Sequence, residues 1–181
     1  MQLYKNKYRS GTTRLEGWDY TNPWWYYVTI CTKHHKEYFG EIINSKMVLN
    51  DIGKIAEEYW AGIPKHNSLI ELDYFVVMPN HLHGILILND NCRDVARNVS
   101  TDNVYSEISP KKNSISSVIR SYKSAVTRWA HMNGFPEFQW QPRFYDRIIR
   151  NDRELYQVRK YIEQNPLKWD IDKSIPENID L

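Results

Sequence analysis

Two histidines one residue apart stand out as candidate metal ligands in this chain of 181 residues. They lie in the apolar stretch Tyr74–Leu88, YFVVMPNHLHGILIL. On a strand, residues i and i+2 point to the same face, so we expect His81 and His83 to project together. Two imidazoles on a rigid strand form half of a divalent-metal site. The alternative is a solvated polar face, but the apolar neighbours favour a central strand, where unpaired imidazoles would be costly.

A metal site needs further ligands, and the last expected helix offers them. The sequence has no His-Glu-x-x-His motif, no Cys-x-x-Cys motif and no acidic cluster near the two histidines. Tyr161, Gln164 and Asn165 occupy positions i, i+3 and i+4, which share one helix face. This face can present a tyrosine and an amide oxygen together. Taken alone, the helix favours a simpler interpretation, with Tyr161 in the core and Asn165 as a C-cap before Pro166.

Two other tyrosines on expected helices are rival nucleophiles. Tyr156 precedes Tyr161 by nearly a turn and a half, so it lies on a different face of the same helix. Tyr122 falls in the apolar stripe of an earlier helix, which predicts a core position. We rank both below Tyr161.

The elements that must position these residues form an α+β pattern. Strands are expected at 24–32, 69–77 and 81–88, a short hairpin within 38–49, and helices after Asn50, after Asn113 or Ser114, and after Asn151 or Asp152. We expect the second helix to end near 133–134 and the last at Pro166, and we interpret 138–149 as an aromatic and basic connector. An antiparallel sheet packed by helices, in a ferredoxin-like arrangement, fits this order, although the strand order itself stays open.

The basic charge of the chain is concentrated in one stretch. The net charge is only +2, but residues 111–160 contain 11 Lys and Arg against 4 Asp and Glu, net +7, which leaves −5 for the rest. Because this stretch leads into the helix of Tyr161, we expect it to contact phosphates and to stack unpaired bases on aromatic rings. The candidates there are Arg120, Lys123, Trp140, Arg143, Arg147 and Arg150. The alternative is a solvated basic face with most of the aromatic rings in the core.

Three segments together resemble the REP-associated tyrosine transposases, which belong to the wider single-tyrosine HUH transposases. They are MPNHLHGI, QWQPRFYDRIIR and YIEQNP, and the resemblance spans residues 24–169. It implies the HUH endonuclease fold, with His81 and His83 as metal ligands, Tyr161 as nucleophile and Asn165 as third ligand. Related enzymes commonly have Gln at this last position, which makes Asn165 the least secure assignment.

The resemblance also implies the cofactor and the substrate. The cofactor would be Mg²⁺ or Mn²⁺, and the substrate single-stranded DNA beside an imperfect palindrome that forms a hairpin. An N-terminal arm carrying Arg14 would read bases at the foot of the hairpin. Tyrosine attack would leave the DNA joined to the protein through a 5′-phosphotyrosine, which conserves bond energy for rejoining, whereas attack by water would only hydrolyse the strand.

Length and composition set the outer limits. We expect an N-terminal arm at 1–23, one domain at 24–169 with a mobile loop near 89–112, and a C-terminal tail at 170–181. Two distant cysteines, Cys31 and Cys92, argue against a disulfide framework and favour the cytoplasm. No leader or membrane span is expected. The oligomeric state, monomer or homodimer, stays open.

Three functions are compatible with these observations. The main hypothesis is a metal-dependent DNA nicking and strand-transfer enzyme. The second is a hairpin-binding protein of the same fold with weak or no catalysis, which would bind DNA without forming a covalent adduct. The third is a metal phosphoesterase that uses water, but the chain lacks the paired His-x-Thr/Ser motifs of the two-histidine phosphoesterases.

Overall fold

Four antiparallel strands form the central sheet of the computed structural model, which describes residues 3–4, 8–9, 15, 17–90 and 114–174. The strands lie side by side in the order β6-β7-β3-β8. Their bounds are β3 Trp24–Cys31, β6 Ile70–Met78, β7 His81–Leu88 and β8 Tyr145–Ile148. Helix α1, Asp51–Ala61, connects β3 to β6, and α3, Ile115–Met132, follows β7 along the chain before β8. This βαββαβ order with the first and third strands in the middle is the expected ferredoxin-like arrangement, which is confirmed.

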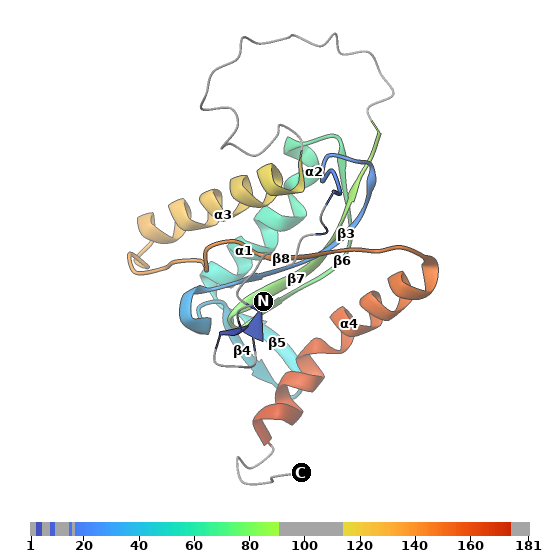
Figure 1. Cartoon of the computed structure of the whole chain (residues 1–181). Coiled ribbons are helices and arrows are strands. Elements are labelled where there is room, and N and C mark those ends of the chain that lie inside the picture. The colour runs from blue at the N-terminus through green and yellow to red at the C-terminus, as the bar shows by residue number, and fades with distance from the viewer. Residues whose placement is uncertain (1–2, 5–7, 10–14, 16, 91–113, 175–181) are drawn as a thin grey trace.

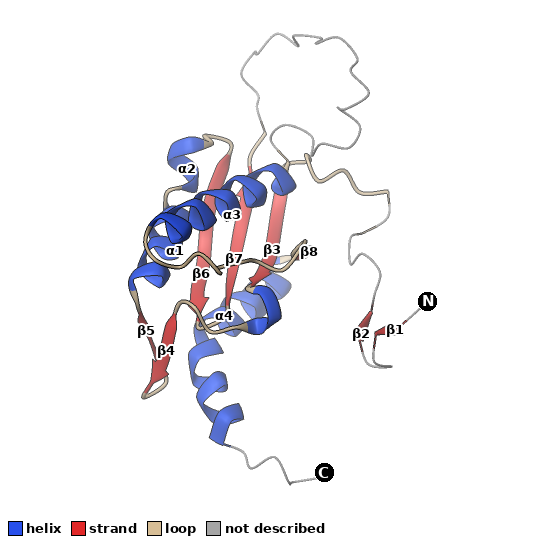
Figure 2. Ribbon diagram, turned by 90° about the vertical axis from the view of Figure 1, so that its left-hand side faces the viewer, coloured by secondary structure: helices blue, strands red, loops and turns tan. Residues whose placement is uncertain are grey.

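Helices cover both faces of the sheet. In Figure 1, α1 and α3 lie on one side of the strands and α4, Asp152–Ser174, lies on the other. Figure 2 shows α1 and α3 crossing the near face of the sheet. The larger core fills the layer under α1 and α3, and a smaller cluster joins α4 to β3 and β7 through Tyr27, Ile85, Leu155 and Ile162. Side chains therefore alternate along each central strand between a large core and the α4 layer.

Helix α1, which covers the large core, begins where the sequence predicts. The side chain of Asn50 accepts a hydrogen bond from the amide of Gly53 at 3.0 Å, which caps α1. Near the end of α1, the fully buried Trp60 lies over Gly84 of β7, and a Cβ at Gly84 would come within 2.4 Å of the indole ring. Gly84 therefore allows a close approach between the helix and the strand that carries the histidines.

A short hairpin stands beside the sheet. It consists of β4, Gly40–Ile43, and β5, Lys46–Leu49, as the sequence predicts. Asn44 and Ser45 form its turn with φ values of 51° and 59°, the left-handed pair that a two-residue hairpin turn requires. The other short elements are β1 Leu3–Tyr4, β2 Tyr8–Arg9, the 3₁₀ turn Lys33–His35 and α2 Ile63–His66.

Two expectations about the C-terminal half are wrong. The aromatic and basic connector expected at 138–149 contains the fourth strand of the sheet, β8, which pairs with β3 from Tyr26–Ile148 to Thr29–Tyr145. The last helix does not end at Pro166 but continues to Ser174. Pro166 removes one backbone donor from α4, so contacts made beyond it must stabilise the last turns.

Several expectations lie partly or wholly outside the described residues. They are about half of the arm expected at 1–23, most of the loop expected near 89–112, and residues 175–181 of the expected tail. Within the part of the chain that the structure describes, no helix is long and apolar enough to cross a membrane.

Candidate active site

The two histidines meet on the α4 side of the sheet. His81 and His83 begin β7, which is flanked by β6 and β3, and their Nε2 atoms are 3.0 Å apart. The two rings meet edge to face with their centroids 4.5 Å apart. Strand periodicity has brought the imidazoles together as the sequence predicts, and both turn the same ring nitrogen toward one point.

Asn80 orients His81. Its side-chain amide donates to the carbonyl of His35 at 2.9 Å, which leaves its oxygen to accept a hydrogen bond from His81 Nδ1 at 2.7 Å. With its proton on Nδ1, His81 presents the lone pair of Nε2 to the site. Asn80 lies in the turn between β6 and β7 and is buried. The same residue therefore forms part of the turn and orients the first histidine.

Two hydroxyl groups orient His83. Its Nδ1 lies 2.7 Å from the Tyr27 hydroxyl and 2.9 Å from the Thr29 hydroxyl. Thr29 faces His83 directly in the β3–β7 ladder, and Tyr27 is two residues earlier on the same face of β3. Sequence reasoning missed both residues, because the register between two distant strands decides which side chain of β3 meets His83. The i, i+2 spacing of Tyr27 and Thr29 indicates only that the two side chains lie on the same face of their strand.

Both imidazoles are held neutral. The pKa of His81 is lowered to about 4, first by burial and then by the nearby His35, while a side-chain hydrogen bond with Asn165 acts in the opposite direction. Burial and then the proximity of His81 lower the pKa of His83 to about 3. At neutral pH the pair therefore offers lone pairs rather than positive charge.

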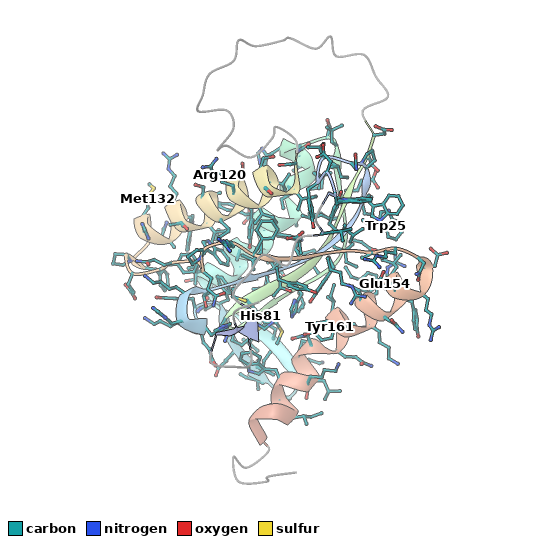
Figure 3. The ribbon with its side chains drawn as sticks, in the orientation of Figure 1. Trp25, His81, Arg120, Met132, Glu154 and Tyr161 are labelled. Carbon is teal, nitrogen blue, oxygen red and sulfur yellow. The ribbon has the colours of Figure 1, made fainter. Side chains whose placement is uncertain are left out.

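Helix α4 brings the remaining predicted residues to the histidines. The ring of Tyr161 meets the ring of His83 at a centroid distance of 5.2 Å and remains 40% exposed. Asn165, one turn later, is buried and hydrogen-bonded to His81. Figure 3 shows Tyr161 on α4 facing the region of His81. Asn165 is not the C-cap that the helix pattern alone favoured, since α4 continues past it.

The rival tyrosines do not reach this site. Tyr122 is buried on the opposite side of the sheet, where its hydroxyl donates to the carbonyl of Ala56 at 3.1 Å and burial raises its pKa. Tyr156 is on α4 but is 66% exposed. Tyr27 touches His83, yet burial raises its pKa far above the ordinary phenol value, so it is suited to hydrogen bonding rather than to attack.

The donor set fits a divalent cation. Two Nε2 atoms 3.0 Å apart subtend about 90° at an ion about 2.1 Å from each, which is the angle between adjacent ligands of an octahedral ion. An amide oxygen of Asn165 beside them would complete one face and leave positions open. Among the described residues no group of three or more His, Cys, Asp or Glu could hold a metal, and the further donor that the structure places beside His81 is the amide of Asn165.

Two residues predicted to contact DNA have structural roles. The indole of Trp140 is buried in the large core and donates to the carbonyl of Lys123 at 3.1 Å, so it is not available to stack on a base. Lys123 is half-buried and donates to the carbonyls of Gln141 and Arg143 at 2.6 and 3.0 Å. Burial lowers the pKa of its ammonium group. Both residues hold the segment that leads into β8 rather than offering a surface to DNA.

The predicted arginines are exposed but do not form one cluster. Arg120 is on α3, and Figure 3 places it on the side of the molecule away from His81 and Tyr161. Arg147 on β8 pairs with Glu154 of α4, and the amide of Arg150 donates to the same carboxylate at 2.7 Å. Arg143 precedes β8 with a φ of 68°. Arg14 lies outside the described residues.

Comparisons with known proteins give one sequence relative and one informative fold. An uncharacterized protein of Haemophilus influenzae is 34% identical over 174 residues, which cover 92% of this chain and 96% of the relative. A REP-associated tyrosine transposase solved bound to a REP hairpin matches with a TM-score of 0.55 and 20% identity, over 86% of this chain and 74% of that chain. The expected resemblance is thereby confirmed at the level of fold.

Other comparisons add less. A presumed transposase from Deinococcus radiodurans covers 84% of this chain and 98% of its own, at 16% identity, but its TM-score of 0.43 is too low to indicate a shared fold. No family model matches the sequence.

Proposed function

Because this chain belongs to the same family as the Haemophilus influenzae protein and has the fold of a REP-associated tyrosine transposase, we propose that it is a DNA-processing enzyme of the transposase type. It would be a metal-dependent, single-tyrosine HUH enzyme that cleaves and rejoins single-stranded DNA beside a hairpin. The observation that carries this proposal is the convergence of His81, His83, Asn165 and Tyr161 on one face of the sheet.

The chemistry assigned to Tyr161 is a phosphoryl transfer. Its phenolic oxygen forms a bond to the phosphorus of the scissile phosphate, the bond from phosphorus to the 3′-oxygen breaks, the phenol loses its proton and the 3′-oxygen gains one. The product is a 5′-phosphotyrosine and a free 3′-hydroxyl. A 3′-hydroxyl can reverse the step and join strands, because no bond energy has been lost to water.

Exposure and position suit Tyr161 to this role. Its ring packs against His83 and Tyr27, so the side chain is held beside the histidines while the ring remains partly open to solvent. A long helix fixes the backbone of the nucleophile, which limits the orientations that the phenol must search before attack.

His81, His83 and Asn165 are the residues that would hold Mg²⁺ or Mn²⁺. A bound divalent ion supplies charge that polarises the scissile phosphate and orients it for in-line attack. The chain's own contribution is to keep the imidazoles neutral and fixed, through burial and through their contacts with Asn80, Tyr27 and Thr29.

Single-stranded DNA with a hairpin is the proposed partner. The solved transposase of this fold is bound to a REP hairpin. Arg143, Arg147 and Arg150 flank β8 and the start of α4 with exposed side chains. We propose that these arginines contact phosphates, together with the N-terminal arm that carries Arg14.

An adduct assay with end-labelled DNA tests the function and its polarity. Hairpin oligonucleotides with single-stranded flanks, taken from the sequence around the gene, are incubated with the protein and Mn²⁺. A 3′-end label should become covalently attached to the protein, and a 5′-end label should be released on a shorter strand. EDTA should abolish the adduct.

Two variants complete the assay. Tyr161→Phe should form no adduct while retaining its circular dichroism spectrum and hairpin binding, and the matched control Tyr156→Phe should react like the wild type. Hairpin binding by the wild type without any adduct would instead support the catalytically weak binding protein. A short labelled product without an adduct would support hydrolysis by water.

A further inference from the structure

The turns of α4 beyond Pro166 also lie at the site. The ring of Trp169 lies 5.8 Å from that of His81 between centroids. The ammonium nitrogen of Lys168 lies 4.9 Å from the centroid of the Tyr161 ring. Residues seven apart on an α-helix lie on nearly the same face, so the continuation of α4 places Lys168 beside the tyrosine. A helix ending at Pro166 would not do this.

A specific contact anchors this extension. The carboxylate of Asp170 accepts hydrogen bonds from the backbone amide of Ser45 at 2.9 Å and from its hydroxyl at 3.0 Å. The left-handed turn of the β4–β5 hairpin exposes that amide. The contact with the hairpin and the packing of the tilted Trp169 ring against His81 together stabilise the helix where Pro166 removes a backbone hydrogen bond. The contacts of Trp169 and Asp170 therefore fix the helix backbone at Lys168.

Lys168 differs from the arginines nearby in its charge partners. Arg159 is paired with Asp73 at 2.7 Å, and Arg147 is paired with Glu154. Within the described part of the chain, the ammonium group of Lys168 contacts the face of the Tyr161 ring, and its side chain is exposed. A cation–π contact leaves the ammonium donors able to bind an anion. A phosphate in line with the phenol of Tyr161 would come within reach of this flexible amine.

We propose that Lys168 is a further catalytic residue, one that binds a non-bridging oxygen of the scissile phosphate and of the resulting phosphotyrosine. The proposal rests on the function proposed above. Lys168 makes and breaks no covalent bond; it stabilises the negative charge that the phosphoryl oxygens carry during attack. A point charge on a mobile stem suits a phosphate that changes its bonding partners.

Single-turnover kinetics and salt-dependent binding test this role. Lys168→Gln, Lys168→Arg and the control Lys160→Gln are compared with the wild type on the same hairpin and Mn²⁺. Lys160 is exposed and adjacent to Tyr161 but is on a different helix face. Lys168→Gln should slow adduct formation at least about tenfold at saturating DNA. Lys168→Arg should restore much of the rate, and Lys160→Gln should react like the wild type.

The binding measurement separates this inference from the proposed function. Lys168→Gln should reduce the slope of log K against log salt by about 0.7, the value expected for one phosphate contact on a single strand, and Lys160→Gln should reduce it less. If the wild type forms no adduct but the slope still falls, the phosphate contact stands and the transposase chemistry fails. An unchanged slope, or an unchanged adduct rate in Lys168→Gln, would overturn the role of Lys168.

Discussion

At the scale of single residues, the site depends on how the two imidazoles are held. His81 is oriented by the side-chain oxygen of Asn80, whose amide nitrogen donates a hydrogen bond to a backbone carbonyl. His83 is oriented by two hydroxyl groups on the neighbouring strand. Hydroxyls both donate and accept, so Tyr27 and Thr29 can accept the Nδ1 proton that a ligand histidine carries. Partners of this kind fix ring orientation and contribute to metal affinity.

Removing the Tyr27 hydroxyl should therefore weaken metal binding. We expect Tyr27→Phe to raise the Kd for Mn²⁺ about tenfold or more, because His83 retains only Thr29 as an orienting partner. Isothermal titration calorimetry with Mn²⁺ measures this without DNA. Tyr145→Phe is the matched control, since the exposed Tyr145 packs against the ring of Tyr27, whereas the hydroxyl of Tyr27 contacts His83 itself. Equal Kd values for Tyr27→Phe and the wild type would contradict the positioning role.

Sequence reasoning at this scale reached the residues whose motifs are local. The spacing of His81 and His83 predicted a shared face, and the spacing of Tyr161 and Asn165 did the same on the helix. Tyr27 and Thr29 could not be found in this way, because their contact with His83 depends on strand register. The aromatic content left the role of Trp140 undecided between stacking and packing, and burial decides it.

At the scale of elements, the strand of the histidines is fixed by close packing against α1. Trp60 is fully buried and its ring lies over Gly84, the residue after His83. A larger residue at Gly84 would have to displace either the indole or β7. The site therefore depends on a contact made on the opposite face of the sheet.

Gly84→Ala should destabilise the protein. The added methyl group would meet the Trp60 ring at 2.4 Å, and overpacking of this kind costs about 1–3 kcal/mol. Urea unfolding should show this loss in the free energy of unfolding. Gly62→Ala is the matched control, because a Cβ there meets its nearest atom at 3.2 Å and should change stability by less. Trp60→Phe should partly rescue Gly84→Ala; additive losses would contradict the proposed clash.

Two elements were missed for identifiable reasons. Strand β8 has only four residues, Tyr-Asp-Arg-Ile, and two charged side chains in a short run indicate a connector rather than a strand. Its pairing with β3 is a long-range contact that local propensity does not reveal. Pro166 favoured a helix end, but Trp169 and Asp170 make contacts that extend the helix past it. In both cases tertiary packing outweighs the local preference.

At the scale of the whole molecule, burying two neutral histidines links folding to pH. In the unfolded chain both imidazoles titrate near 6.5, whereas in the folded protein their pKa values are about 4 and about 3. Between these limits the unfolded state binds more protons than the folded state. The free energy of unfolding must therefore fall as the pH is lowered from about 6.5 toward 4.

Acid should thus destabilise the metal-free protein. Each histidine contributes up to about 1.4 kcal/mol per pH unit in this window, so a loss of about 1 kcal/mol or more is expected between pH 6.5 and pH 5. Urea titrations in EDTA at these two pH values measure it. The double variant His81→Gln/His83→Gln should lose less stability over the same interval. An equal loss in both proteins would assign the effect to other groups.

The fold as a whole places the candidate site on one face of the sheet and most of the core on the other. Figure 1 shows α4 on one side of the sheet and α1 and α3 on the opposite side. Substitutions in the large core should therefore act on stability, whereas those beneath α4 should act on metal binding and on DNA chemistry. The order of the helices and of the first three strands of the sheet was predictable because it follows local pattern and capping; strand β8 and the sheet order are set by long-range pairing.

The central claim is that Tyr161 becomes covalently joined to DNA. Trypsin cleavage after Lys160 and Lys168 releases the peptide 161–168, with Tyr161 as its first residue. After reaction with hairpin DNA and Mn²⁺ and nuclease trimming, tandem mass spectrometry of this peptide should locate a 5′-phosphonucleotide on Tyr161. A nucleotide on another residue, such as Tyr156, or a wild-type protein that binds the hairpin and carries no nucleotide, would contradict the account.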